Sequence, residues 1–295
     1  MGKGNDPNCG ATALAAEPLL ATDGMTLIDQ LAATTGPARA QKAAELLATA
    51  GAVAALRDMP HSLIVDMDDT LITNQALFDD AQRALADLYA RLDPQGRDPQ
   101  ELSELHEQMD DANIAQFGFT PRRWYFSAFQ AAQTYLGRKL TDEDRLAVKE
   151  AAKIAMGTGQ PLPGVRDALS VLAANDVRML LKTKGAQAKQ AEKLNVHRFD
   201  EYFGQRIEIV DRKDESSFRD LIGRHDLRSP VSIGDSAKSD IVPALAAGAE
   251  GILIDKTSTG VSSWAYEHAD DLDVPTVASF PEAVLLLVSR HMQTA

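Results

Sequence analysis

Acidic, hydroxyl and lysine side chains follow four short apolar runs of this chain. The first run is followed by Asp66 and Asp68, and a second run ends at Thr183. Lys213 follows a third run, and the segment 234–240 follows a fourth with the sequence Gly-Asp-Ser-Ala-Lys-Ser-Asp. Carboxylates can attack phosphorus or bind a hard cation, and hydroxyl and ammonium groups can bind phosphate oxygens. These residue types favour chemistry on a phosphate ester if the fold brings them together.

The pattern of apolar runs and helix-like segments predicts the elements that carry these residues. We expect strands at 62–66, 177–181, 206–210, 231–233 and 251–254, and helices at 165–174, 186–194 and 216–224. Strands that alternate with helices form a mainly parallel sheet covered on both faces, which is a doubly wound α/β fold. Ligands of such sheets bind beyond the carboxyl ends of the strands. The four groups of polar residues are therefore expected at one edge.

Two further regions are helical in pattern. A long segment between the first two strands predicts helices at 79–89, 100–117, 121–136 and 142–156. The Ala-rich N-terminal region predicts helices at 27–33 and 38–56 and contains no catalytic cluster, so we interpret it as a packing or oligomerisation segment. The chain is thus divided into a helical N-terminal extension at 1–59, an α/β core at 60–73 and 161–295, and a helical insert at 74–160.

The four groups resemble the signature motifs of the haloacid dehalogenase superfamily. Asp-x-Asp-x-Thr is matched at 66–70, a strand with Thr at 183, a lone Lys at 213, and Gly-Asp-Ser with a later Asp at 234–240. All four occur in the superfamily's order, which is much more specific than any one motif. The resemblance covers the chain from about residue 61 onward. It implies a Rossmann-like core with an inserted helical cap.

The resemblance also implies a reaction. Asp66 would attack phosphorus and form an aspartyl-phosphate, a role that suits a carboxylate held rigidly at the tip of a strand. Asp68 would be the general acid that protonates the leaving oxygen and later the base that activates water. Thr183 and Lys213 would bind the non-bridging phosphate oxygens.

A magnesium ion is the cofactor that the resemblance implies. Two acids facing a phosphate dianion would repel it, so a cation is required, and oxygen ligands of this kind suit Mg²⁺. The implied ligands are the carboxylates of Asp66 and Asp235 and the backbone carbonyl of Asp68, with Asp240 in a supporting position behind them. Thr70 and Ser236 would also support the site, Thr70 by bracing its loop.

Several of these residues have simpler interpretations. The trio 68–70 could be a solvated turn, because Asp and Thr are common after strands. Asp240 could cap the helix that follows it. Lys213 lies in a charged stretch, and Arg212 or Lys184 could take its place beside the phosphate.

The expected cap contains the segment 122–126, Arg-Arg-Trp-Tyr-Phe, which combines cations with aromatic rings. Such a segment could bind an anionic or planar substrate. We favour a helix that buries Trp124 and Phe126 and leaves its arginines in water.

Composition restricts the partners and the setting. The formal net charge of −13 argues against nucleic acid as a main partner, because duplex binding depends on Lys and Arg. Cys9 is the only cysteine, which excludes an intramolecular disulfide and favours a reducing, cytoplasmic setting. We find no secretory signal pattern and no apolar run long enough for a membrane span, so no membrane partner is expected.

The sequence thus predicts a magnesium-dependent phosphohydrolase that acts on a small phosphorylated substrate, a phosphomonoester. A phosphomutase or phosphotransferase would keep every motif, so that alternative stays open. A haloacid dehalogenase would need neither Asp68 nor the metal-binding acids, and a non-catalytic binding protein would not require Asp66 or Asp235. The substrate and the oligomeric state are left open.

Overall fold

The core of the protein is a parallel sheet. The computed structural model describes residues 26–93, 96–118, 120–255 and 272–294. The six-stranded sheet has the order β3-β2-β1-β4-β5-β6, and all neighbouring strands are parallel. The strands are β1 Ser62–Val65, β2 Met179–Lys184, β3 Ile207–Val210, β4 Pro230–Gly234, β5 Glu250–Ile254 and β6 Thr276–Val277. The strand order reverses at β1, which confirms the expected doubly wound α/β fold.

Helices cover both faces of this sheet. The helices of the core are α7 Val165–Ala174, α8 Gln187–His197, α9 Asp200–Phe203, α10 Glu215–Arg224, α11 Val242–Ala246 and α12 Phe280–Thr294. Successive side chains of a strand point to opposite faces. Leu63 and Val65 of β1 accordingly join the apolar cluster that includes α7 and α12, whereas Ile64 joins a second cluster with α10 and α11.

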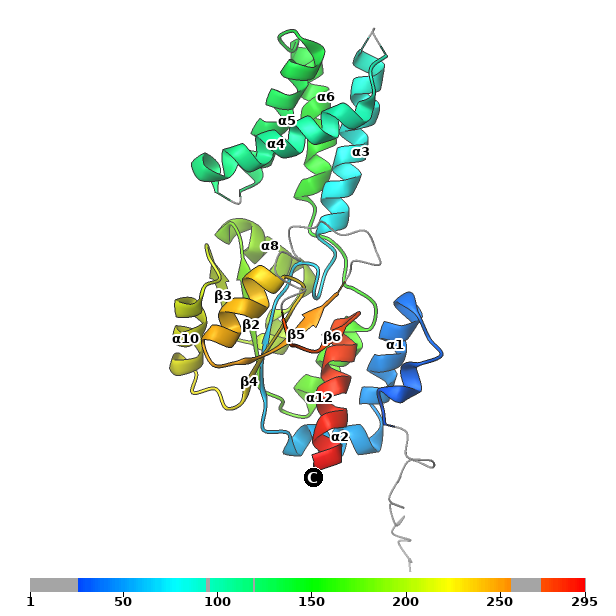
Figure 1. Ribbon diagram of the computed structural model, residues 1–295, viewed down its shortest axis with the longest axis vertical. Coiled ribbons are helices and arrows are strands. Elements are labelled where there is room, and N and C mark those ends of the chain that lie inside the picture. The colour runs from blue at the N-terminus through cyan, green and yellow to red at the C-terminus, as the bar shows by residue number, and fades with distance from the viewer. Residues whose placement is uncertain (1–25, 94–95, 119, 256–271, 295) are drawn as a thin grey trace, which may run out of the picture.

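The N-terminal region packs onto the core. A 3-10 helix, η1 Asp29–Leu31, precedes α1 Gly36–Leu47 and α2 Ala50–Asp58. The single helix expected at 38–56 is therefore wrong: the chain breaks at Ala48 and Thr49. Helix α1 packs against α12, as Figure 1 shows, and Arg39 Nε donates to Glu282 Oε2 at 2.7 Å. These helices belong to the same apolar cluster as β1, so they cover one face of the sheet.

The insert forms a helical cap beyond the carboxyl ends of the strands (Figure 1). It consists of α3 Gln75–Leu92, α4 Pro99–Phe117, α5 Pro121–Leu136, α6 Asp142–Ala152 and the 3-10 helix η2 Lys153–Met156. Side-chain oxygens of Asp98, Thr120 and Thr141 cap the starts of α4, α5 and α6. The cap has its own apolar cluster, in which Tyr89 and Val148 are fully buried.

Two chain segments connect the cap with the core, and they are hydrogen-bonded to each other. Thr73 N donates to Gln160 O at 2.8 Å, and Gln160 N donates to Thr73 Oγ1 at 3.0 Å. Gly159 has φ +73°, and a Cβ added there would lie 1.9 Å from Thr73 O. This close approach requires glycine, so the connection has a defined geometry.

The structure also contains elements that the sequence pattern did not predict. These are α9, β6, α12 and a π-helix, η3 Ala237–Ile241, directly after β4. Strand β2 ends at Lys184, three residues beyond the expected end at residue 181. Among the described residues, no helix has the length and apolar character that crossing a membrane would require.

Candidate active site

Three buried carboxylates and one lysine meet at the carboxyl edge of the sheet. Asp66 follows β1 and Asp235 follows the neighbouring strand β4, while Asp240 lies in η3. One carboxylate oxygen from each of these three residues lies within 4.8 Å of the other two. Lys213 Nζ donates to Asp66 Oδ1 and, at 2.6 Å, to Asp240 Oδ1. We call these four residues the acid cluster.

The charges of the acid cluster do not balance. Burial raises the pKa of Asp66 to about 7, the nearby Lys213 ammonium acts against this rise, and the carboxylates of Asp240 and Asp68 add to it. Burial alone would lower the pKa of Lys213, but Asp240 and Asp66 outweigh it and raise that pKa. Three carboxylates with one ammonium leave net negative charge in a buried place, which a divalent cation would neutralise. The oxygen donors fit Mg²⁺.

Asp240 is held by the loop that follows β4. Its Oδ2 accepts from Ser236 N at 3.0 Å, and Ser236 Oγ accepts from Ser239 N at 3.2 Å. Ser236 thus caps η3, which contains Asp240. The helix that follows Asp240 is α11, whose N-cap is Ile241, so the interpretation of Asp240 as its cap is wrong. The side chain of Asp240 packs on Gly234, where an added Cβ would lie 2.4 Å from Asp240 Oδ2. The Gly-Asp-Ser sequence therefore supplies the carboxylate of Asp235 and also fixes the position of the Asp240 side chain.

The structure places Lys213, and not Arg212, at the acid cluster. Lys213 is buried, whereas Arg212 is exposed. Lys184, the other alternative, also lines the cavity described below, and its Nζ lies 3.4 Å from Ser239 Oγ. Burial and the nearby Lys213 charge lower the pKa of Lys184. Lys184 and Lys213 therefore both line the cavity.

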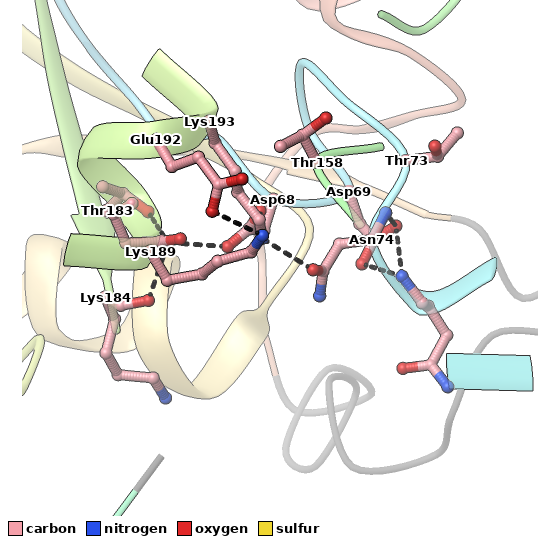
Figure 2. A network of polar contacts seen from close by, with 12 residues as sticks. Asp68, Asp69, Thr73, Asn74, Thr158, Thr183, Lys184, Lys189, Glu192 and Lys193 are labelled. Carbon is pink, nitrogen blue, oxygen red and sulfur yellow. Dashed lines mark hydrogen bonds and ion pairs between the residues drawn. The ribbon is translucent and has the colours of Figure 1, made fainter. Parts of the chain in front are cut away.

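The carboxylate of Asp68 is bonded to helix α8. Lys193 Nζ donates to Asp68 Oδ1 at 2.7 Å and to Asn74 Oδ1 at 2.8 Å, and Figure 2 shows this network. Gln190 Nε2 donates to Asp68 Oδ2 at 2.7 Å. Neither partner was among the site residues predicted from the sequence. Their spacing of three residues, on the helix that follows β2, is the signal that could have indicated one face of α8 turned toward the site.

The loop after β1 is held by Asp69 and not by a hydrogen bond from Thr70. Asp69 has φ +58°, and its carboxylate accepts from Asn74 N and Gln75 N, each at 2.9 Å (Figure 2). Thr70 is buried, and its hydroxyl has no hydrogen-bond partner within the described part of the chain. Thr70 therefore supports the loop by packing, while Asp69 joins the loop to the start of α3.

Thr183 is fully buried beneath Gln190. Its Oγ1 lies 2.7 Å from Gln190 Nε2, and it does not line the cavity. Lys184 and Gly185, which follow Thr183 at the end of β2, line the cavity instead. In this arrangement Thr183 positions Gln190, and its contact with a phosphate would require Gln190 to move.

A cavity of about 270 Å³ lies between the acid cluster and the cap. The core side contains the acid cluster with Asp68 and three further lysines, Lys184, Lys189 and Lys193. The cap side contains Phe78, Thr120, Arg123, Trp124 and Met156, with Gln75 near the connecting segment. The site is thus anionic and cationic on one side and largely apolar on the other.

The segment 122–126 only partly follows the expectation. Trp124 is buried, with its ring 5.7 Å from that of Phe78 in an edge-to-face arrangement, but Phe126 is 42% exposed. Arg123 is not in water: its Nε and Nη2 donate to the two carboxylate oxygens of Asp110 at 2.9 and 2.8 Å. The prediction of two buried aromatics with solvated arginines is therefore wrong for Phe126 and Arg123.

Comparisons with known proteins identify the fold. No protein-family model and no curated protein matches the sequence. Sixty chains of solved structures match this chain. One is a haloacid dehalogenase-like family hydrolase from Xanthomonas campestris, which has 22% sequence identity and a TM-score of 0.63; the match covers 80% of this chain and 95% of that one. A HAD hydrolase from Bacillus subtilis, bound to magnesium, has 17% identity, TM-score 0.52 and coverage of 77% and 98%.

A HAD family hydrolase from Deinococcus radiodurans, with bound phosphate and sodium, has 16% identity, TM-score 0.53 and coverage of 80% and 98%. Dehalogenases are also among the matches. At these identities the similarity shows the fold, and that fold is haloacid dehalogenase-like.

Proposed function

We propose that this chain, with its haloacid dehalogenase-like fold, is a magnesium-dependent phosphohydrolase that acts on a small phosphomonoester. The observation that carries the proposal is the acid cluster, in which a carboxylate at the tip of β1 lies beside two more carboxylates and a lysine at the base of a cavity. The phosphate bound by one structural neighbour and the magnesium bound by another support the same reading.

In the first step, a carboxylate oxygen of Asp66 attacks phosphorus and the bond to the leaving oxygen breaks. Asp68 gives its proton to that oxygen, so the alcohol departs neutral. In the second step, water attacks phosphorus of the aspartyl-phosphate, loses a proton to the Asp68 carboxylate, and releases phosphate and free Asp66. Lys193 and Gln190 donate to the two carboxylate oxygens of Asp68, so they would orient this side chain for the proton transfers.

The carboxylates of Asp66 and Asp235, with the backbone carbonyl of Asp68, would hold the Mg²⁺ ion. When bound, the ion neutralises the negative charge of the phosphate and of the acids around it. Asp240 already accepts from Lys213 and from Ser236 N, so we assign it to orienting Lys213. Lys213 and Lys184 would bind the non-bridging phosphate oxygens, and Thr183 would join them if Gln190 moves.

The same residues favour hydrolysis of a phosphate over dehalogenation. Displacement of a halide from carbon needs the nucleophile but no cation. Here Asp240 and Asp68 lie near Asp66 as well as Lys213, and without a cation these two acids would repel a carboxylate substrate. A phosphomutase remains the second candidate, because it uses every residue named above and differs only in returning the phosphoryl group to a sugar phosphate.

Hydrolysis of an aryl phosphate by the wild type and by Asp66→Asn tests the proposal. Each protein is assayed with Mg²⁺ and with a chelator, and circular dichroism establishes that the variant is folded. We expect phosphate release only from the wild type with Mg²⁺. A folded Asp66→Asn variant with near wild-type turnover would refute the covalent mechanism. If the protein released halide from a 2-haloacid but no phosphate from the ester, it would be a dehalogenase and not a phosphohydrolase.

A further inference from the structure

The cap side of the cavity carries apolar groups that face the phosphate-binding side. Phe78 of α3 and Trp124 of α5 meet edge to face, with ring centroids 5.7 Å apart, and Met156 of η2 lines the cavity beside them. Phe78 is half-buried, so part of its side chain is available for contact, whereas Trp124 is buried. The part of a substrate that extends from the phosphorus toward the cap therefore meets hydrocarbon.

Two polar donors on the cap side already have acceptors within the cap. Gln75 Nε2 donates to Asp79 at 2.9 Å, and the Thr120 hydroxyl donates to Phe117 O at 3.0 Å. A hydroxyl of a substrate that entered this part of the cavity would lose water and would have to compete with these acceptors for a hydrogen bond, which costs free energy. The cap therefore disfavours a polyol.

The arginine on the cap side is committed to the structure of the cap. Arg123 forms a two-bond ion pair with Asp110, and its Nη1 donates to Gly118 O at 3.2 Å. Asp110 in turn accepts from Ser127 Oγ at 3.0 Å, which fixes its position between α4 and α5. Because Asp110 neutralises Arg123, this arginine does not provide an uncompensated positive charge for a second anionic group of a substrate.

The lysine nearest to the cap is also paired. Lys189 Nζ donates to Glu192 Oε2 at 2.9 Å and to the carbonyl oxygen of Met156. The cationic groups that remain on the core side lie around the acid cluster, where the phosphate itself would bind. The cavity of about 270 Å³ is also below the usual range of roughly 300–1,000 Å³ for sites of larger ligands.

We propose that the cavity selects phosphomonoesters whose alcohol part is compact, uncharged and apolar, aromatic by preference, over esters that carry a polyol or a second anion. Phe78 and Met156 are the specificity-determining contacts, with Trp124 behind them. The inference rests on the proposed function for its turnover assay, but it also makes a binding prediction that does not depend on catalysis.

Three primary alkyl esters of similar leaving-group reactivity test the selectivity: benzyl phosphate, a glycerol phosphate and a carboxyalkyl phosphate. We expect kcat/KM for benzyl phosphate to exceed the other two by about tenfold or more, the discrimination an apolar pocket supplies. Phe78→Ala should lower kcat/KM for benzyl phosphate by about tenfold, mainly through KM, and change the glycerol ester by less than about twofold. Phe126→Ala, an exposed aromatic on α5 outside the cavity, is the matched control and should change neither value.

Binding of the non-hydrolysable benzylphosphonate and methylphosphonate, measured by calorimetry with Mg²⁺ present, separates this inference from the proposed function. Tighter binding of benzylphosphonate that is lost in Phe78→Ala supports the inference even if no ester is hydrolysed. If kcat/KM is higher for the glycerol or carboxyalkyl ester, or if the two phosphonates bind equally well, the inferred selectivity is wrong. The proposed phosphohydrolase activity would not be affected by that result. If Phe78→Ala does not fold, Met156→Gln provides the same comparison.

Discussion

Replacement of Lys213 by Met should lower stability and raise metal affinity at the same time. Met keeps the length of the side chain and removes its charge. The Lys213 ammonium bonds to two carboxylates whose side chains are 7% and 3% exposed, so its loss leaves buried charges without their counter-ion. Breaking one side of a buried ion pair costs about 3–5 kcal/mol. Because Asp66 has a pKa raised to about 7 and can take up a proton, we expect the lower end of that range.

The effect on metal affinity has the opposite sign. The lysine repels a cation bound among carboxylate oxygens that lie within 4.8 Å of one another. Two unit charges about 4 Å apart interact by about 4 kcal/mol at an effective dielectric constant near 20. Rearrangement of the wild-type lysine reduces this value, so we expect Lys213→Met to bind Mg²⁺ at least about tenfold more tightly, or by about 1.4 kcal/mol. Turnover should nevertheless fall, because a phosphate ligand is lost.

Calorimetric titration with Mg²⁺ and urea unfolding, each with and without chelator, measure the two effects. Lys189→Met is the matched control for the metal titration: it removes a lysine from the same cavity without touching the acid cluster, and its Mg²⁺ affinity should stay close to that of the wild type. If Lys213→Met binds Mg²⁺ with unchanged or weaker affinity, the lysine is not the counter-ion of the carboxylates, and the charge argument for the metal fails.

Two further predictions concern the cap and its connection. Gly159→Ala should destabilise the protein by about 2 kcal/mol or more, measured by thermal unfolding. A left-handed φ costs about 1–2 kcal/mol, and the new Cβ also clashes with Thr73 O. Gly137→Ala is the control: Gly137 also has a positive φ but has open space around it, so this change should cost less. Asp144 has its pKa lowered to about 2 from 3.8, first by the hydrogen bond from Arg138, so its stabilisation is present above pH 4 and lost as the pH falls toward 2. The wild type should be more stable to unfolding than Asp144→Asn by about 1 kcal/mol at neutral pH, and this difference should decrease as the pH falls from 4 toward 2. A difference that does not change with pH would show that the Asp144 carboxylate does not provide this stabilisation.

The framework of the fold was predictable because its signals are local. The run 62–65 is apolar throughout, as a strand buried on both faces requires, and it ends at Asp66. The cap helices α4 and α5 were placed within one residue at each end, because Pro99 and Pro121 at their starts and glycines after their ends are strong signals. The acids of the first and fourth motifs meet because parallel strands bring their carboxyl ends to one edge.

The remainder depends on packing that one sequence does not display. Trp124 and Phe126 are two residues apart on one helix, and nothing local indicates that only the first faces the cap interior. The bonds of Gln190 and Lys193 to Asp68 join positions more than 120 residues apart. The break between α1 and α2 occurs at Ala48 and Thr49, neither of which stops a helix strongly, so tertiary contacts decide it.

The packing of α1 on α12 has a consequence for folding during synthesis. Arg39 and its partner Glu282 are separated by 243 residues, and the ribosome adds about 5–20 residues per second. Helix α12, which completes this face of the sheet, is therefore synthesised on the order of ten to fifty seconds after α1 and α2. Leu63 and Val65 stay uncovered by α12 throughout that interval. The cap, whose apolar cluster comes from residues 78–156 alone, can assemble earlier. The newborn chain should therefore carry a folded cap on an unfinished core, and the exposed face of β1 is where a chaperone would bind it.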